Sequence, residues 1–196
     1  MKTLLRNLSV AALMTVVSAS LQAQTDTIVY GRTTISSSTF LQYVASFNVT
    51  VTDLAGNPVQ NTAKTFPVVE GVIDLQTGAG EVTNAGGYLF RGNGNSVRIQ
   101  NLVLDATNPT NPVMTALFIV NDKLVGRQPL YQVTAPAGIS LPLQPQAGTE
   151  QINGLNLTLT RAAAIILNNA IIITEPVLQP GTSAGTADIY AVLLPR

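Results

Sequence analysis

Apolar and polar residues alternate along much of the chain, and turn-forming residues close each alternating run. Four such runs follow one another between residues 86 and 133, and Gly, Asn, Asp or Pro residues separate them. Alternation with period two is typical of strands that bury one face, and Gly and Asn tolerate the positive φ angles of hairpin turns. The pattern predicts a four-stranded antiparallel meander made of residues 88–90, 96–105, 113–120 and 123–133.

Two irregularities in this meander carry predictions of their own. The parity of the alternation changes at Gln100-Asn101, which indicates a β-bulge, because one extra residue swaps the faces that the side chains reach. The strand 113–120 is apolar on both faces around Phe118. We therefore expect this strand to be covered on both sides or to form part of an interface.

The most regular alternation lies before the meander, in residues 41–51. Its odd positions are all apolar and its even positions are nearly all polar, so it predicts a strand with Tyr43 and Phe47 on the buried face. The strand is expected to end at a turn around Asp53, whose carboxylate can accept hydrogen bonds from the amides that follow it.

The remaining runs complete an all-β prediction with one helix. Residues 161–170 are rich in Ala, Leu and Ile and follow Thr160, a good N-cap, so they predict a short helix that plugs one end of the core. The expected fold is an antiparallel β-sandwich with one short helix in the C-terminal half. Its further strands are residues 27–34, 68–75, 151–160 and 187–194.

The turn after residue 51 carries a first resemblance. Its sequence Val51-Thr52-Asp53-Leu54-Ala55-Gly56-Asn57-Pro58-Val59 resembles the strand-turn-strand of bacterial immunoglobulin-like domains, in which a D-x-x-G-N-P-V turn is common. The resemblance covers nine residues. It implies a surface β-sandwich module that serves in adhesion or spacing, without catalysis.

A second resemblance lies in the glycine-punctuated strands 71–80 and 87–90. They are similar to those of secreted HtaA-type domains, some of which bind haem. The haem contacts of that family are a Tyr and a His, and the present chain has no His. The resemblance therefore implies a sandwich-like architecture and leaves the ligand open.

The first residues predict the protein's destination. Lys2 and Arg6 precede an apolar run at residues 8–17 and then small and polar residues that end at Ala23. This is the pattern of a bacterial secretory signal peptide, and the apolar run is too short to span a bilayer. We expect cleavage after Ala23, or after Ala19, and one domain in residues 24–196 that is secreted or periplasmic and has no membrane span.

Composition narrows the chemistry. The chain has no Cys and no His, which excludes Ser-His-Asp and Cys-His nucleophiles and the HExxH zinc site. Without Lys2 and Arg6 it keeps eight basic and ten acidic residues, so nothing attracts nucleic acid. No cofactor is predicted.

Two groups of residues with side-chain oxygens are candidates for catalysis or for metal binding. Glu70, Asp74 and Glu81 are close in sequence and could pair as glycosidase carboxylates, although a solvated strand face explains them as well. For metals, none is predicted. If one bound, the best candidate would be calcium in the loop with Asp105, Asn108 and Asn111, because carboxylate and amide oxygens are its preferred ligands.

The sequence thus predicts an exported, non-enzymatic module with a structural, adhesive or binding role at the cell envelope or outside the cell. Its partner, a protein or a surface, and its oligomeric state stay open. The alternative is a carrier that holds a small apolar ligand in the mouth of the sandwich near the helix 161–170. An adhesive subunit needs an exposed edge or apolar patch, whereas a carrier needs a cavity.

Overall fold

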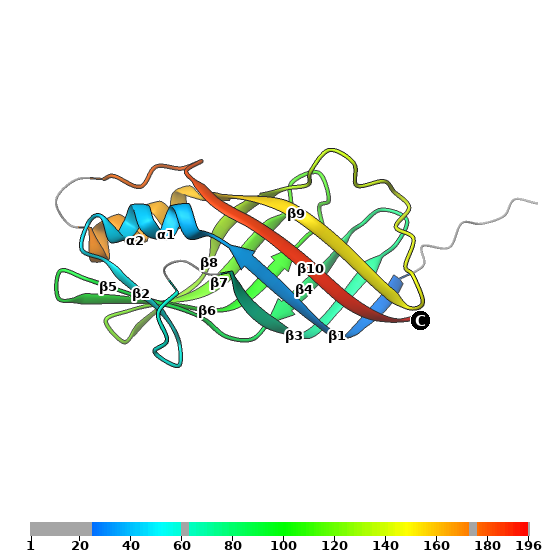
Figure 1. Ribbon diagram of the computed structural model, residues 1–196, viewed down its shortest axis with the longest axis horizontal. Coiled ribbons are helices and arrows are strands. Elements are labelled where there is room, and N and C mark those ends of the chain that lie inside the picture. Colours follow the sequence, from blue (N-terminus) through cyan, green and yellow to red (C-terminus); the bar gives the residue numbers. More distant parts are fainter. Residues whose placement is uncertain (1–24, 60–62, 173–175, 196) are drawn as a thin grey trace, which may run out of the picture.

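The computed structural model describes residues 25–59, 63–172 and 176–195, which form ten strands and two helices (Figure 1). The predicted signal peptide lies outside the described residues. In chain order the elements are β1 (Thr25–Ser36), α1 (Ser38–Ala45), β2 (Thr50–Asp53), β3 (Lys64–Asp74), β4 (Gly80–Asn84), β5 (Gly87–Gly92), β6 (Asn95–Asp105), β7 (Val113–Val120), β8 (Lys123–Thr134), β9 (Thr149–Leu159), α2 (Arg161–Ile171) and β10 (Ser183–Pro195).

All ten strands belong to one antiparallel sheet that curves round and closes on itself. The strand order is β2-β5-β6-β4-β3-β1-β10-β9-β8-β7, and β7 pairs again with β6. Eight strands therefore form a ring, from which β5 and β2 extend at one end. The prediction of an all-β antiparallel fold is confirmed, and opposite walls of the closed sheet face each other across the core as the layers of a sandwich do. Closure also pairs most strand edges that would otherwise be free.

The ring closes through β6, which exchanges partners at its bulge. Residues 95–100 of β6 pair with β5, residues 103–105 pair with β4, and the other edge of β6 pairs with β7. The exchange occurs at Asn101, whose φ of 54° lies in the left-handed region and whose amide donates to the Gly86 carbonyl. The predicted bulge at Gln100-Asn101 is thus confirmed, and it lets one strand serve both the ring and the extension.

The meander is confirmed strand by strand. β5 pairs with β6, β6 with β7 and β7 with β8. Strand β7 buries Met114, Ala116 and Phe118 completely, while the residues between them are half-buried. Phe118 is therefore a core residue. The other face of β7 is only partly covered, although its apolar residues predicted that both faces would be covered.

The strand predicted at residues 41–51 is wrong up to residue 49, because β2 begins only at Thr50. Residues 38–45 form helix α1, which buries Phe40, Leu41 and Val44, and Tyr43 is 41% exposed instead of lying in the core. The spacing of the buried residues is helical, so the alternation of apolar residues was coincidental here. Asn48, at φ 59°, lies between the helix and β2. A left-handed residue is a common stop after a helix.

The turn that follows β2 has the predicted centre. The Oδ1 atom of Asp53 accepts from the amides of Ala55 (2.9 Å) and Asn57 (2.8 Å), and Oδ2 accepts from Lys64 Nζ at 2.6 Å. The Lys64 ammonium and the Asn57 donors hold the pKa of the Asp53 carboxyl well below its usual range. The carboxylate thus ties β2 to the beginning of β3.

The predicted C-terminal helix is confirmed as a plug. Thr160 accepts a hydrogen bond from the Ala163 amide at 3.2 Å, as an N-cap does. Helix α2 packs on β5, β6 and β8, and α1 packs on β2 and β10. Figure 1 shows both helices at one end of the molecule, over the extension formed by β5 and β2.

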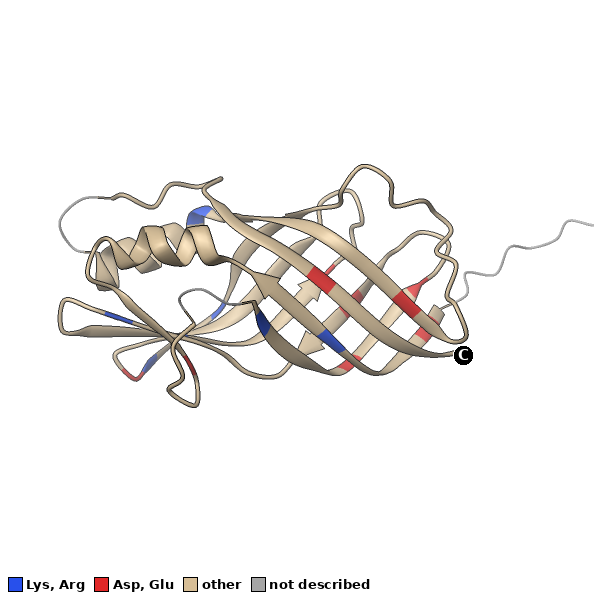
Figure 2. Cartoon of the chain, viewed as in Figure 1, with Lys and Arg blue, Asp and Glu red and all other residues tan. Residues whose placement is uncertain are grey.

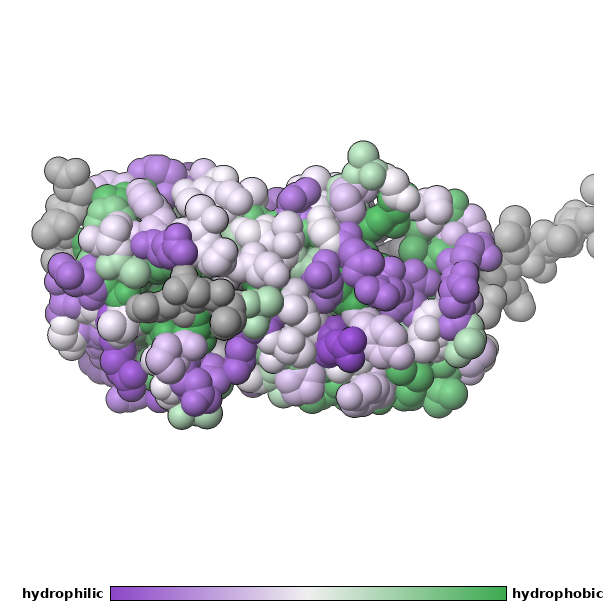
Figure 3. Space-filling view, viewed as in Figure 1, coloured by the Kyte–Doolittle hydropathy of each residue, from purple (hydrophilic) through white to green (hydrophobic). Residues whose placement is uncertain are grey.

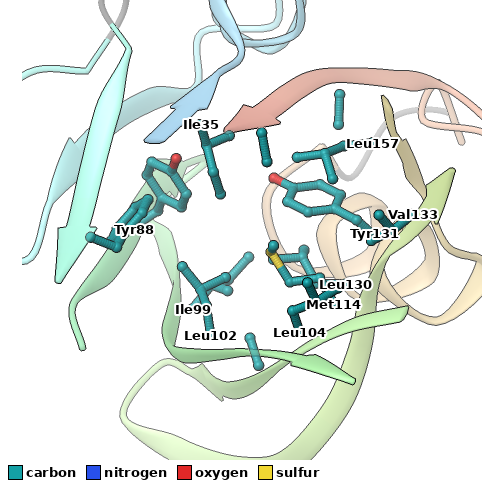
Figure 4. Packing of buried hydrophobic residues seen from close by; sticks show 14 of the residues in the cluster. Ile35, Tyr88, Ile99, Leu102, Leu104, Met114, Leu130, Tyr131, Val133 and Leu157 are labelled. Atoms are coloured by element: carbon teal, nitrogen blue, oxygen red, sulfur yellow. The ribbon is translucent and has the colours of Figure 1, made fainter. Parts of the chain in front are cut away.

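Buried side chains fill the core between the helices and the middle of the ring. Tyr88 and Tyr131 lie inside the closed sheet among aliphatic side chains, with their hydroxyls turned toward the interior (Figure 4). Burial raises the pKa of both tyrosines above the ordinary phenol value. Phe66, Tyr88 and Phe90 make edge-to-face ring contacts, with centroids 5.2 and 6.2 Å apart.

Candidate functional site

The end of the closed sheet opposite the helices is hollow. A cavity of about 220 Å³ lies there between the strands, and its walls are almost entirely apolar. Ile73 of β3, Leu104 of β6, Val133 of β8 and Ile189 of β10 come from different sides of the ring and face this space. Figure 3 shows hydrophobic residues gathered around an opening at this end of the molecule.

Three connections form the mouth of the cavity. Gly78 comes from the β3–β4 turn, Pro109 and Pro112 from the β6–β7 loop, and Ile139 and Leu141 from the long β8–β9 connection. A hydrogen bond holds the β8–β9 connection against the β3–β4 turn. In it, the Leu143 amide donates to the Leu75 carbonyl at 2.7 Å. Leu141 is nevertheless 51% exposed at the rim. The mouth thus presents apolar side chains to the solvent.

This cavity is not where the sequence placed a ligand. The carrier hypothesis put the ligand near helix 161–170, but that helix packs on β5, β6 and β8 and contributes no residue to the described cavity walls. Ala163, Ala164, Leu167 and Ile171 of α2 are buried and occupy the space at their end. The helix closes one end of the sheet, and the opening lies at the other end.

One acidic residue lines the apolar cavity. Glu150 of β9 pairs with Ala191 of β10, which also faces the cavity. Its Oε2 atom is buried and accepts no hydrogen bond from any of the described residues. Burial raises the pKa of the Glu150 carboxyl, and the backbone amide of Gln151 offsets only part of this effect. A buried polar atom without a partner is costly to a fold and needs a physical reason.

A bulge explains why Glu150 faces inward. The pairing of β9 with β10 shifts between Ile152–Ile189 and Leu155–Ala187, so two residues of β9 stand opposite one residue of β10. Gly154 takes a φ of 70° in this bulge, and its amide donates to Asp188 Oδ1 at 2.7 Å. Leu155, Leu157 and Leu159 point inward at odd positions, whereas Ile152 and Glu150 line the cavity at even positions.

Sequence reasoning missed Glu150, although the signal was there. Within the run 151–160 the apolar positions change parity between Ile152 and Leu155, with Asn153-Gly154 between them. An Asn-Gly pair inside an alternating strand indicates a bulge. Extending the alternation back from Ile152 would have placed Glu150 on the inner face.

The calcium candidates lie together at the end of β6 and in the β6–β7 loop, and one side-chain oxygen of each accepts a hydrogen bond from a neighbouring residue. Asp105 Oδ1 accepts from the Thr107 hydroxyl (2.6 Å) and amide, Asn108 Oδ1 accepts from the Thr110 hydroxyl (2.7 Å) and amide, and Asn111 Oδ1 accepts from Gln132 Nε2. The Thr107 hydroxyl, followed by its amide, lowers the pKa of Asp105. Among the described residues no three His, Cys, Asp or Glu side chains are grouped to hold a metal ion.

The three candidate glycosidase carboxylates occupy separate surroundings. Glu70 and Glu81 are exposed on β3 and β4, where they stand opposite Thr83 and Val72. Asp74 Oδ1 accepts from the amides of Gln76 (2.8 Å) and Thr77 (3.2 Å) and so shapes the β3–β4 turn. These are the surroundings of solvated and turn-forming acids. That the protein is not an enzyme remains a prediction.

Comparison with known proteins identifies the fold. No protein-family model and no curated protein sequence matches the chain. Among solved structures, the C-terminal domain of HtaA from Corynebacterium glutamicum is similar with a TM-score of 0.63 and 17% identity over 86% of this chain and 99% of that one. The N-terminal domain of HtaA has a TM-score of 0.55 and 11% identity over 84% of this chain and 98% of that one. The heme-binding protein HtaB of the same organism has a TM-score of 0.53 and 13% identity over 88% and 95%.

These likenesses support the HtaA-type resemblance at the level of fold. These comparisons do not test the resemblance of the turn at Asp53 to immunoglobulin-like domains, which stays a prediction. Within the described parts of the chain, neither helix has the length and apolar character needed to cross a membrane.

Proposed function

We propose that this protein is an exported, non-enzymatic binding module that holds a small apolar ligand in the cavity at the hollow end of its closed sheet. The cavity itself carries the proposal. Interiors of proteins pack to the density of organic crystals, whereas here the strands surround an apolar cavity of about 220 Å³ that opens between the loops at this end. An unfilled apolar space costs stability, and a ligand that fills it restores the lost contacts.

The size of the cavity limits the ligand. An engineered apolar cavity of about 150 Å³ admits benzene, and pockets for drug-sized molecules span about 300 to 1,000 Å³. At about 220 Å³, the present cavity suits a molecule with one small ring or a short alkyl chain.

The solved neighbours support a binding role without naming the ligand. HtaB is a heme-binding protein by its name. In HtaA-type domains the haem contacts are a Tyr and a His, and this chain has no His. We therefore do not extend haem binding to this chain. The predicted signal peptide, followed by a single predicted domain in residues 24–196, supports a role outside the cytoplasm.

A surface patch favours a second role, adhesion to a protein or surface partner. Val29 and Tyr30 of β1 are 49% and 61% exposed, and Val69 of β3 is 57% exposed. The β1–β3 register places these residues side by side, between the pairs Ile28–Gly71 and Gly31–Val68. A contiguous apolar group on an outer sheet face is typical of an interaction surface.

Native mass spectrometry of the protein purified from its own source tests the proposal. We expect a persistent extra mass of a small molecule on the wild-type protein. The substitution Ala191→Leu, which adds side-chain volume inside the cavity, should remove it. Ala55→Leu makes the same change on the exposed β2–β3 turn and should retain the extra mass. A protein without extra mass that also takes up no added apolar compound would contradict the proposal, and a mass retained by Ala191→Leu would place the ligand elsewhere.

A further inference from the structure

The cavity end of the molecule is acidic as well as apolar. Figure 2 shows acidic residues concentrated on this half of the closed sheet and most basic residues on the helix-covered half. The strand registers place the acids beside cavity walls, with Asp26 opposite Ile73, Glu81 opposite Val72 and Glu150 opposite Ala191. The acids of this end are Asp26, Asp74, Glu81, Asp105 and Glu150.

Two of these acids, Glu150 and Asp26, each have one buried carboxylate oxygen that accepts no hydrogen bond from the described residues. Glu150 lines the cavity, and within the described parts of the chain no donor reaches its buried Oε2 atom. Asp26 is 3% exposed, and its buried Oδ1 atom likewise has no donor among the residues that the structure describes. Asp26 lines a recess next to the cavity, and Leu143 and Leu193 line both spaces.

Within residues 25–59, 63–172 and 176–195, no basic side chain lines the spaces that these two carboxylates face. Among the described residues, neither the cavity wall nor the recess contains a Lys or an Arg. The ion pairs of the described residues, Lys64–Asp53 and Arg98–Asp122, involve other acids. A carboxylate in apolar surroundings is destabilised unless an opposite charge and hydrogen-bond donors compensate it. A positively charged ligand can therefore supply the opposite charge that the described cavity wall and recess lack.

On this basis we propose that the ligand is a primary amine with a small apolar body, bound as its ammonium form with the charged group on the Glu150 carboxylate. This inference rests on the proposed function, because it concerns the same cavity. The ammonium group has three donors, one of which satisfies the free Oε2 atom. Asp26 adds a second negative charge at the same end, and the apolar body replaces the contacts that the empty cavity lacks.

The inference gives a simple order of affinities. Hexan-1-amine and hexan-1-ol have nearly the same length and shape, but only the amine is a cation at neutral pH. A charge-assisted hydrogen bond to a partly buried carboxylate favours the amine by about tenfold or more. Without the carboxylate, the two compounds should bind alike.

Isothermal titration of the full protein with both compounds tests this order. Wild-type protein should bind the amine about tenfold more tightly than the alcohol, and Glu150→Gln should bring the two affinities within about threefold. Glu70→Gln removes the same charge from the exposed face of β3 and should keep the preference. Alcohol binding by Glu150→Gln shows that its cavity is still folded.

The outcomes separate the two proposals. If both compounds bind wild-type protein equally, the cavity binds apolar ligands but the amine inference is wrong. If the amine preference survives in Glu150→Gln, another group holds the ammonium and the assignment to Glu150 is wrong. If neither compound binds, the proposed function itself fails.

Discussion

The two ends of the closed sheet are built from the same kind of strand but are closed in opposite ways. At one end, two helices cover the opening, and Leu167 and Phe118 are at most 1% exposed. At the other end only loops cover the opening, and the strands enclose a cavity of about 220 Å³ with Leu141 51% exposed at its rim. The core is thus filled at the helix-covered end, and the end that lacks helices holds the cavity in which we propose that a ligand binds.

The largest effect is expected where the helix-covered end is tightest. Phe118→Asp places a carboxylate at a position that is 0% exposed, and burying an unpaired charge costs several kcal/mol, about enough to unfold a domain of this size. We expect the variant to be unfolded by circular dichroism and by its sensitivity to protease. A folded variant with native-like spectra would overturn the core position of Phe118.

A pair of leucine truncations compares the two ends directly. Leu167→Ala removes a buried side chain of α2 and should lower the free energy of unfolding by about 2 to 5 kcal/mol. Leu141→Ala, at the exposed rim of the cavity, should change it by about 0.5 kcal/mol or less. Urea denaturation measures both values. Equal losses would mean that the β8–β9 connection is as well packed as the helix.

A second pair adds volume instead of removing it. Ala187 and Ala191 are both buried on β10, but only Ala191 lines the cavity. Ala187→Leu should destabilise the protein by about 1 to 3 kcal/mol because it overpacks a filled core. Ala191→Leu should be tolerated with a smaller loss or a small gain, since the cavity can take the added methyl groups. The same penalty at both positions would show that the cavity is too narrow to accept side-chain atoms.

The smallest effect is a dependence of stability on pH at the hollow end. The folded protein raises the pKa of Glu150 above its ordinary value of 4.5, so the folded state holds that proton more tightly than the unfolded state does. Stability therefore falls as the pH rises from about the ordinary value through the raised one. Glu150→Gln should remove this part of the pH dependence in urea titrations. An unchanged pH profile would show that Glu150 is solvated in the folded state.

Much of this architecture follows from local patterns in the sequence. The meander, the bulge at Asn101, the turn at Asp53 and the cap at Thr160 each depend on a few neighbouring residues, and each was predicted. Helix α1 was missed because the odd positions of residues 41–51 are apolar, a pattern that fits a strand. The segment is a helix because only that conformation buries Phe40, Leu41 and Val44 together against the sheet. This packing depends on strands far away in the sequence, so local patterns do not reveal it.

The site was harder to predict because it depends on closure of the sheet. Glu150 stands beside Ala191, 41 residues away in the chain, only because β9 pairs with β10. The bulge at Asn153-Gly154 could be inferred from the sequence, but which end of the ring stays hollow could not, since the helices decide it. The ligand was therefore expected beside α2, at the end that α2 fills.

The most direct test of the central claim is an NMR titration of the isotope-labelled protein with hexan-1-ol, followed through the backbone amide signals. We expect saturable shifts confined to the cavity walls and mouth, for example at Gly78, Leu141, Glu150 and Ala191, while the amides of α1 and α2 stay unchanged. Shifts centred on the helices, or no saturable shifts at all, would contradict the claim that the hollow end is the binding site.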